Sequence, residues 1–517
     1  MARAAEAVVT GRARLALLGL CVALRVVSLV RPCLSDDEAI YAVVARELLT
    51  GHALYRDVVD HKPPAIYVVY AATQAVGGPT GGMVLLHGLL ILVVLATALA
   101  LARIVRRHAG ADPRAALAAA ALWCVSSTTL VDVDALAANC ELFMMLPLTL
   151  GVEAVLDARA ARRPLAQLAL AGALTAAAAM FKYQGAIQLP LFAIAVLAVG
   201  GVSVRARLAG LVAIGVGFAA VIAAVVGALA WIGALPAALF WLKFNFAYIE
   251  AGSSRGEVLL RLAARGGLVV AGAPLLYGAA LAALPTARRA PFVRFAAGWA
   301  VVSALAVSVG GRFFGHYFHQ LTAPLAVLAA PVVVRLWDRR RALVIAAAAL
   351  PALAFAALAA LHDPVMRAYG EPDPDYARVV AALDRRGPGA LCVWGNSPVL
   401  YFLAERPLGC RFSFANYLTG LSPATATQSD PTVDSSRNVV PEAWDMLEVD
   451  LAERAPRFIV DGSPGNVAFY GKYPPARFPR LARVLACAYD AVDEVAGMRI
   501  YERRAAARCP APAARRP

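Results

Sequence analysis

The long polar segment that follows the first apolar run holds the densest set of side chains suited to acid–base chemistry. Asp36, Asp37 and Glu38 open it, and Lys62 begins a Lys-Pro-Pro turn near its end. Carboxylates directly after an apolar run are costly unless they face water, a cation or a reacting group. An acid and a cation together can bind a phosphate ester and activate a hydroxyl group beside it. The alternative, an acidic start of a surface helix, explains Asp36 or Glu38 but not the Lys-Pro-Pro turn.

Other residues of this segment must position the acids and the lysine. Residues 38–50 predict a short amphipathic helix that begins at the acids. Asp60 and His61 directly precede Lys62, so they are suited to orienting it or to binding a sugar.

The composition predicts that these groups are carried by a polytopic membrane protein. The chain has 517 residues, of which 61% are hydrophobic and 16% are charged, and its mean hydropathy is +0.66. A soluble domain has about 45–50% apolar and about 25% charged residues. We predict about eleven membrane-spanning helices from the length of the apolar runs. They cover roughly 15–31, 80–104, 115–131, 135–156, 164–181, 186–201, 208–232, 266–285, 293–309, 320–336 and 342–361.

Arginine marks alternate connections between these spans, as with Arg106, Arg107 and Arg114 between the second and third. Because positively charged loops stay in the cytoplasm, the N-terminus is predicted to be cytoplasmic. An odd number of spans then places residues 362–517 outside. The same distribution argues against a nucleic-acid partner, although the net charge is +15. The excess lies in short loops of residues 1–361, with 30 basic and 16 acidic residues, whereas residues 362–517 hold 19 and 18.

Two further segments differ from the spans. Residues 233–265 form a long outer connection with Phe240, Trp241 and Phe244 at near-helical spacing. They predict either an amphipathic helix at the membrane interface or a helix packed on the bundle. From residue 362 the composition becomes that of a soluble domain.

The sequence therefore divides into three parts. Residues 1–361 are predicted to form the transmembrane domain, 362–505 a small extracytoplasmic α/β domain, and 506–517 a disordered tail. Buried strands are expected at 391–396 and 457–462, and a closing hairpin over 482–490 and 497–503. Cys392, Cys410, Cys487 and Cys509 all follow residue 362. They are consistent with one or two disulfides in an oxidising compartment or with free buried thiols.

The first polar segment resembles the first periplasmic loop of the GT-C membrane glycosyltransferases in Asp37-Glu38, Tyr41 and the Lys-Pro-Pro turn. More narrowly, it is similar to bacterial relatives of protein O-mannosyltransferases and of lipid A aminoarabinose transferase (glycosyltransferase family 39-like). The resemblance continues through Asn139-Cys140-Glu141, Lys182-Tyr183-Gln184, Gly311-Arg312-Phe313, His316-Tyr317 and Trp394-Gly395-Asn396-Ser397-Pro398, and so covers nearly the whole chain. It implies a multi-pass protein of the bacterial inner membrane that takes a sugar from a polyprenyl-phosphate donor. The acceptor would lie outside the cytoplasm and be a protein, a lipid or a cell-envelope glycan.

The resemblance also implies roles for single residues. The catalytic acids would be Asp37, as general base of an inverting displacement, and Glu38. The donor phosphate would be bound by Lys62, Arg312, His316 and Lys182. The substrates would contact Tyr41, Asp60, His61, Asn139, Glu141 and Tyr317. Two alternatives stay open: Lys182 is also placed to snorkel at a span end, and Asp132 or Asp134 could supply the second acid in place of Glu141.

Two departures limit what the resemblance carries over. The aminoarabinose transferase has an arginine where this chain has Ile40, and an acid where it has His61. The phosphate contacts are therefore expected to differ, and neither the sugar nor the acceptor of that group is transferred. A divalent cation, Mg²⁺ or Mn²⁺, is a candidate cofactor because Asp36, Asp37 and Glu38 offer hard oxygen ligands.

Two other functions compete with glycosyl transfer. A transporter or lipid flippase would carry paired half-repeats and ionisable groups at mid-membrane depth, whereas the charges here gather near one face. A scaffold that only holds the C-terminal domain at the membrane would not need the set of Asp37, Lys62 and Arg312.

Overall fold

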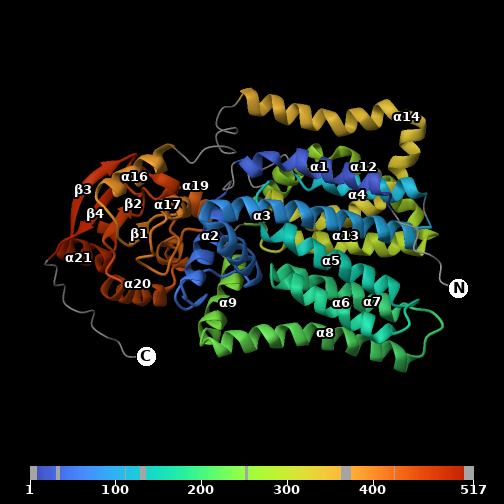
Figure 1. Cartoon of the computed structure of the whole chain (residues 1–517), viewed down its shortest axis with the longest axis horizontal. Coiled ribbons are helices and arrows are strands. Elements are labelled where there is room, and N and C mark those ends of the chain that lie inside the picture. The colour runs from blue at the N-terminus through green and yellow to red at the C-terminus, as the bar shows by residue number, and fades with distance from the viewer. Residues whose placement is uncertain are drawn as a thin grey trace.

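The computed structural model describes residues 9–30, 35–110, 112–128, 136–250, 254–361, 374–423 and 425–505. They form a bundle of helices with a smaller α/β domain at one end (Figure 1). The bundle and its connections contain α1 (Gly11–Val30), α2 (Asp36–Leu49), α3 (Ala65–His108), α4 (Pro113–Ser126), α5 (Cys140–Asp157), α6 (Pro164–Ala179), η2 (Tyr183–Gln188), α7 (Leu189–Leu197), α8 (Val204–Trp231), α9 (Leu235–Glu250), α10 (Arg255–Arg261), η3 (Leu262–Gly266), α11 (Gly267–Gly272), α12 (Pro274–Ala283), η4 (Leu284–Arg288), α13 (Pro291–Ser308), η5 (Gly315–Phe318) and α14 (His319–Leu361). A polytopic helical membrane protein is thus confirmed as the fold class. The predicted candidates Asp132 and Asp134 lie outside the described residues.

The number of spans is not confirmed. Among the described residues, five helices are long and apolar enough to cross a membrane, or six if the bent pair Arg255–Gly272 and Pro274–Arg288 is one span. The 44-residue α3 replaces the shorter predicted span at 80–104 and bends at Gly78, whose φ of 68° suits glycine. The predicted spans at 320–336 and 342–361 lie within α14, which is interrupted at Arg340. Hydropathy locates apolar runs, but kinks and helices that continue into polar segments change their length and number.

Helix α2 forms where the sequence places an N-cap before three acids. The Ser35 hydroxyl accepts a hydrogen bond from the Glu38 backbone N–H, which satisfies a donor that the first turn leaves free. The three acids that follow favour the positive end of the helix dipole. Thr50 ends the helix, and Gly51 turns the chain away at a φ of 93°. This local signal predicts the 38–50 helix well, and the structure begins it two residues earlier.

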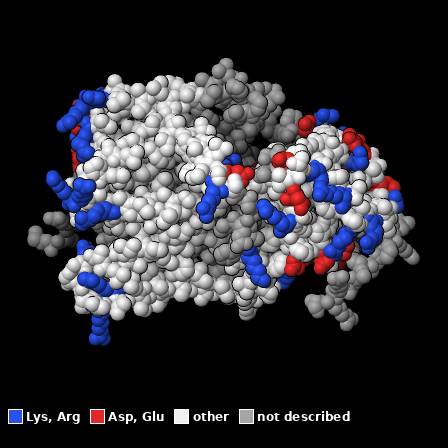
Figure 2. Space-filling model, turned by 180° about the vertical axis from the view of Figure 1, so that it is seen from behind, with Lys and Arg blue, Asp and Glu red and all other residues white. Residues whose placement is uncertain are grey.

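Basic side chains gather at the end of the bundle away from the C-terminal domain (Figure 2). There Arg103 makes two 2.7 Å hydrogen bonds to the Glu153 carboxylate, and Arg107 bridges Glu153 and Asp157. The wide face between this end and the C-terminal domain is almost free of charged side chains in the view of Figure 2. This distribution is the one expected of a bundle whose middle lies in hydrocarbon.

The C-terminal domain is built on a four-stranded sheet in the order β1-β2-β4-β3. Its strands are β1 (Leu391–Trp394), β2 (Phe458–Asp461), β3 (Tyr489–Val495) and β4 (Met498–Arg503); its helices are α16 (Pro374–Arg385), α17 (Pro398–Ala404), α18 (Asn416–Thr419), α19 (Ala426–Ser429), η6 (Ser436–Asn438), α20 (Pro441–Glu453), η7 (Val467–Phe469), η8 (Pro475–Arg477) and α21 (Pro479–Ala488). β1 pairs parallel to β2, and β4 runs antiparallel to both of its neighbours. The predicted α/β domain is confirmed, and the tail at 506–517 lies outside the described residues.

The predicted closing hairpin is displaced along the chain. Residues 482–488 belong to α21 rather than to a strand, because Leu481, Leu485 and Ala488 fall on one face of a helix and are buried there. The hairpin consists of β3 and β4, which are joined by a turn at Ala496 and Gly497. The spacing of the apolar residues between 481 and 488 is therefore that of a helix, and the first strand of the hairpin begins only at Tyr489.

The open question on the cysteines is answered in part. Cys392 and Cys410 form a disulfide, and Cys487 is also disulfide-bonded. Cys509 lies outside the described residues. Cys21, Cys124 and Cys140 are buried free thiols in the bundle.

Helix α9 answers the question about residues 233–265. Trp241 is fully buried, and its ring centroid lies 4.8 Å from that of Tyr417 and 6.3 Å from that of Phe412. The side chain therefore packs on the C-terminal domain, which favours a packed helix over one that only lies in the interface.

Candidate active site

The first acidic cluster lies at the end of the bundle that faces the C-terminal domain, where α2 sits between the two (Figure 1). The Lys62 Nζ donates a 2.9 Å hydrogen bond to the Asp37 carboxylate. Tyr41 follows Asp37 by one helical turn, so its hydroxyl reaches the same carboxylate at 3.3 Å. The Lys62 ammonium also lies 4.6 Å from the centre of the Tyr41 ring. The predicted acid and cation are therefore brought together as a partly exposed ion pair.

The backbone of the first loop is held so that Lys62 reaches Asp37. Tyr55 adopts a left-handed conformation with a φ of 72°, and its hydroxyl donates a 2.7 Å hydrogen bond to the Lys62 carbonyl. A non-glycine residue in this region is strained and is often found at functional sites. The buried Asp60 carboxylate accepts hydrogen bonds from the Tyr67 hydroxyl at 2.7 Å and from the His61 backbone N–H at 2.6 Å. Asp60 thus anchors the loop just before Lys62.

The charges of this cluster stabilise one another. Burial would raise the pKa of Asp37, but the adjacent Lys62 ammonium and the His316 imidazole lower that pKa below its ordinary value. Burial likewise opposes the charged form of Lys62, yet Asp37 and Asp60 raise its pKa above the ordinary value. The pKa of Asp60 is lowered, because Lys62 and His61 outweigh the effect of burial. Asp37, Asp60 and Lys62 are therefore all charged at neutral pH.

A second ion pair joins Glu141 at the start of α5 and Lys182 just before η2. The His316 Nε2 lies 3.8 Å from the Glu141 carboxylate, and the Lys182 ammonium lies 3.4 Å from the centre of the Tyr317 ring. Asn139 is the N-cap residue of α5 and is buried, but its side chain makes no capping bond. The structure thus brings Glu141, Lys182, His316 and Tyr317 together in a second cluster.

One contact and one charge interaction connect the two clusters. The Cys140 thiol lies 3.4 Å from the Tyr41 hydroxyl, so the residue next to Glu141 touches the residue that contacts Asp37. His316 approaches Glu141 and also lowers the pKa of Asp37. The site thus holds two carboxylate–lysine pairs with His316 near both.

Two further predicted residues contact other parts of the chain. Glu38 is fully buried, where its carboxylate accepts a 2.6 Å hydrogen bond from the Ala138 backbone N–H and lies 3.2 Å from His87 Nε2. Arg312 is also buried and donates a 3.0 Å hydrogen bond to the Ser422 hydroxyl of the C-terminal domain. Phe313, which follows it, has a φ of 51°. The contacts of Glu38 favour a positioning role, and those of Arg312 link the bundle to the C-terminal domain.

Sequence reasoning missed the residues that support the site from other elements. Tyr55 and Tyr67 carried no signal beyond their position near the Lys-Pro-Pro turn. Tyr417 and Ser422 lie more than 350 and about 110 residues from their partners, His61 and Arg312. No local pattern can reveal such pairs, because only the docking of the C-terminal domain brings them together.

The three acids that were candidate ligands of a divalent cation are not gathered around one point. Asp37 is paired with Lys62, Glu38 faces Ala138 and His87, and Asp36 is exposed. Neighbouring carboxylates on α2 thus point to different surroundings. Within the described ranges, no group of three or more His, Cys, Asp or Glu side chains is arranged to hold a metal ion.

Comparisons with known proteins relate this arrangement to solved structures. No protein-family model matches the sequence, and no curated protein matches it. The structure of ArnT from Cupriavidus metallidurans in the apo state superposes with a TM-score of 0.57 at 16% identity, over 94% of this chain and 97% of that one. The Archaeoglobus fulgidus oligosaccharyltransferase in complex with Zn and sulfate gives 0.52 at 16% identity, over 95% and 73%.

A further structure of the Archaeoglobus fulgidus protein, AglB, contains an inhibitory peptide and a dolichol-phosphate. It superposes with a TM-score of 0.51 at 13% identity, over 96% of this chain and 74% of that one. AglB and ArnT are both GT-C superfamily membrane glycosyltransferases. The chain therefore has the GT-C fold of these membrane glycosyltransferases.

Proposed function

We propose that the chain is an integral-membrane glycosyltransferase that moves a sugar from a polyprenyl-phosphate-linked donor to an extracytoplasmic acceptor. The observation that carries the proposal is the Asp37–Lys62 pair at the end of an apolar bundle. A base and a phosphate-binding cation at this position are what transfer from a lipid phosphate requires. The fold supports the same class, since AglB has been solved with a dolichol-phosphate.

The proposed reaction is a single inverting displacement. The oxygen of the acceptor hydroxyl attacks the anomeric carbon, and its proton passes to the Asp37 carboxylate. The bond between that carbon and the phosphate oxygen breaks, and the polyprenyl phosphate leaves with the electron pair. Lys62 stabilises the negative charge that develops on the phosphate.

The hydrogen bond from Lys62 to Asp37 gives the donor a way to activate the base. When a phosphate draws the Lys62 ammonium toward itself, Asp37 loses the neighbour that lowers its pKa. Burial, which acts in the opposite direction, then raises the pKa of Asp37 and makes it a stronger base. Donor binding would thus prepare Asp37 for the acceptor.

The second pair is proposed to bind the rest of the donor. Lys182 and His316 are cationic or hydrogen-bonding groups beside Glu141, suited to a phosphate oxygen and to sugar hydroxyls. Asn139 and Tyr317 are placed at the same cluster for further sugar contacts. The acceptor, a protein, a lipid or a cell-envelope glycan, would approach from the side of the C-terminal domain. The arginine-rich end of the bundle would lie in the cytoplasm (Figure 2).

The proposal is tested by transfer of label with the purified, full-length protein. A panel of radiolabelled polyprenyl-phosphate hexoses and pentoses is offered with an extract of cell-envelope acceptors. We expect label to move from one donor into an acceptor fraction. Label that accumulates inside sealed vesicles without any new glycosidic product would overturn the proposal in favour of a transporter.

Glu38→Gln tests whether Glu38 is catalytic. The amide oxygen of glutamine can still accept the hydrogen bond from the Ala138 N–H, whereas it cannot accept a proton as a base. If Glu38 only positions α2, the variant should keep kcat within about tenfold of wild type, well short of the 10²- to 10⁴-fold loss expected for a general base. A larger loss in folded protein would instead assign Glu38 to the chemistry.

Removal of divalent cations gives an independent prediction. Because Lys62 supplies the positive charge next to Asp37, we expect transfer rates with EDTA and with added Mg²⁺ or Mn²⁺ to agree. The measurement is the initial rate after dialysis against chelator. Activity that disappears with EDTA and returns with one metal would contradict the prediction.

A further inference from the structure

One segment of the C-terminal domain, residues 410–417, lies directly against the first loop. The Val59 backbone N–H donates a 2.8 Å hydrogen bond to the Arg411 carbonyl, and Val59 and Phe412 form a parallel β-bridge. The Arg411 guanidinium donates to the Arg56 carbonyl at 3.1 Å. Val59 immediately precedes Asp60, so this contact ends where the loop turns into the site.

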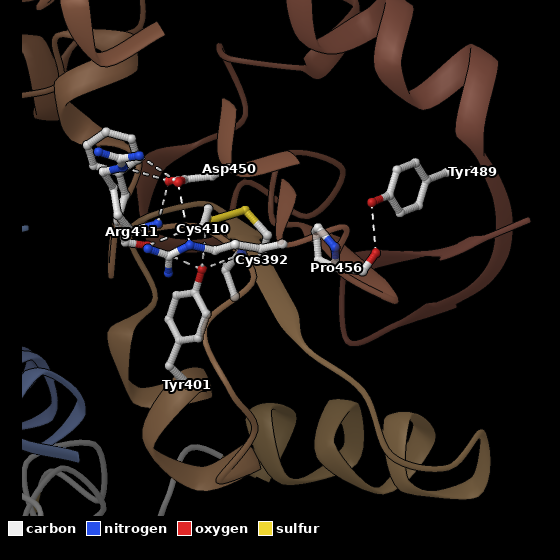
Figure 3. Close-up of a disulfide and its surroundings, with 10 residues drawn as sticks. Cys392, Tyr401, Cys410, Arg411, Asp450, Pro456 and Tyr489 are labelled. Atoms are coloured by element: carbon white, nitrogen blue, oxygen red, sulfur yellow. Dashed lines mark hydrogen bonds and ion pairs between the residues drawn. A yellow bond between two sulfur atoms is a disulfide. The ribbon is translucent and has the colours of Figure 1, made fainter. Parts of the chain in front are cut away.

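The 410–417 segment is itself fixed inside the C-terminal domain (Figure 3). The disulfide between Cys392 and Cys410 ties its start to β1. The Arg411 side chain makes hydrogen bonds of 2.8 and 2.9 Å to both oxygens of the buried Asp450 carboxylate. The Tyr401 hydroxyl donates to the Phe412 carbonyl at 3.3 Å. The disulfide and the Arg411–Asp450 ion pair thus fix the 410–417 segment, which in turn contacts the first loop.

The end of the segment reaches the site through Tyr417. Its hydroxyl lies 2.9 Å from His61 Nδ1, in hydrogen-bond contact. Its ring is buried and packs against Trp241 and Phe244, with centroids 4.8 and 5.2 Å apart. Asp60 also approaches His61 Nδ1, at 3.0 Å. Tyr417 and Asp60 therefore both contact the same ring nitrogen of His61, the residue before Lys62.

A further contact shows that the loop depends on the C-terminal domain for its shape. The Arg454 guanidinium donates a 2.6 Å hydrogen bond to the Asp57 carbonyl. Loop residues that are not held in this way would have to be ordered again before each reaction, at a cost in conformational entropy. The backbone between residues 56 and 59 is thus anchored at three places by groups of the C-terminal domain.

We propose that the C-terminal domain positions the catalytic loop, with Tyr417 as a positioning residue that holds His61 and, through it, Lys62 in register with Asp37. The inference rests on the proposed function for its kinetic readout. It also makes a structural statement, the restraint of residues 53–62 by the segment 410–417, that can be measured without any activity.

Tyr417→Phe is the sharpest variant, because it removes the hydroxyl bond to His61 and keeps the ring in its packing. Misplacement of reacting groups by about 1 Å can cost about 100-fold in rate, so we expect kcat to fall by about tenfold or more. The KM for the donor should change little, since the attraction of Lys62 for phosphate tolerates small displacements better than proton transfer does. Unfolding temperature should stay at the wild-type value.

Tyr489→Phe is the matched control. It removes one buried tyrosine hydroxyl of the same domain, which donates a 2.7 Å hydrogen bond to the Pro456 carbonyl away from the loop (Figure 3). We expect wild-type kcat for this variant. If both variants lose kcat equally, or if Tyr417→Phe loses none, the positioning role is overturned.

Hydrogen–deuterium exchange separates failure of the inference from failure of the proposed function. Amides of residues 53–62 should exchange faster in Tyr417→Phe and in the double variant Cys392→Ala/Cys410→Ala, and at the wild-type rate in Tyr489→Phe. This result would support the restraint even if no donor were found in the transfer assay. If residues 53–62 exchange at the wild-type rate in Tyr417→Phe and in Cys392→Ala/Cys410→Ala, the inference is overturned, whatever the transfer activity.

Discussion

Asp37→Asn is expected to reduce kcat for sugar transfer by about 10²- to 10⁴-fold, the range that a general base contributes. Asparagine has the same shape as aspartate, but it keeps only one of the two oxygens, so in this arrangement it accepts the hydrogen bond of Lys62 or that of Tyr41 and not both. It cannot take the proton of the acceptor hydroxyl. The loss should therefore appear in kcat, and the unfolding temperature should change little because the Asp37 side chain is 31% exposed. The measurement is initial rate against donor concentration, with the amount of folded protein checked by gel filtration.

Asp36→Asn is the natural control for this experiment. It makes the same chemical change one residue earlier on α2, at an exposed position. Its kcat should match that of wild type. Full activity of Asp37→Asn would remove Asp37 from the role of base, while an equal loss in both variants would point to the helix N-terminus as a whole.

Lys62→Met is expected to lower kcat/KM by about 10²- to 10³-fold, as loss of a group that stabilises a developing negative charge typically does. Methionine keeps the length and apolar part of the side chain but removes the charge that pairs with Asp37 and is proposed to bind the donor phosphate. Both KM for the donor and kcat should suffer, because the ammonium acts in binding and in the departure of the phosphate. Lys62→Arg should recover part of the loss, since it restores charge but not the geometry of the ammonium.

Lys62→Met should also shift the pH dependence of the transfer activity in a defined direction. In wild type, Lys62 holds the pKa of Asp37 below its ordinary value of 3.8, so the base stays ionised as the pH falls toward that value. Without Lys62, burial raises the pKa, and the acidic limb of the residual activity should move to higher pH. The pairing also stabilises the fold above the pKa that Asp37 has in the unfolded chain, and this contribution is lost as the pH falls through the lowered folded-state pKa.

Lys472→Met provides the comparison for Lys62→Met. Lys472 lies in the C-terminal domain, where its ammonium donates to the Asp430 and Val433 carbonyls. Removing this charge should leave kcat/KM and its pH profile as in wild type. A pH profile of Lys62→Met that coincides with wild type would mean that Asp37 does not titrate in the acidic limb.

The two carboxylate–lysine pairs explain how so many charges can be placed at the edge of an apolar bundle. A single buried charge without a partner is costly, but Asp37 with Lys62 and Glu141 with Lys182 neutralise each other until a substrate arrives. A donor phosphate that draws Lys62 away would leave Asp37 without its partner, which is the condition that raises the pKa of Asp37.

Sequence alone determined the class of protein and the first cluster. The long apolar runs predict a bundle of membrane-spanning helices, because a helix satisfies all of its backbone hydrogen bonds within one segment when it crosses hydrocarbon. The acids after Ser35 and the Lys-Pro-Pro turn lie in the same polar segment, and their chemistry predicted that Asp37 and Lys62 act together. Local chemistry also located α2, whose cap and acidic first turn are readable from neighbouring residues.

The number of spans and the contacts that the site residues make with distant helices could not be predicted from the sequence. Helix α3 extends past its apolar part and bends at Gly78, and α14 merges two apolar runs, so hydropathy counted elements that the fold joins. Glu38 looked like Asp37 in the sequence, yet α2 turns successive side chains by about 100°, which sends Glu38 to His87 and Ala138 inside the bundle.

Only the tertiary structure shows that the C-terminal domain contacts the first loop. Its sequence indicated strands and cysteines but no link to the first loop. Docking brings Tyr417 to His61 and Ser422 to Arg312, and pairs Val59 with the disulfide-bound segment. Such contacts depend on the packing of residues hundreds of positions apart, which no local spacing records. The sequence thus identified the groups that we propose to carry the chemistry, and the packing of the two domains fixes the loop that holds them.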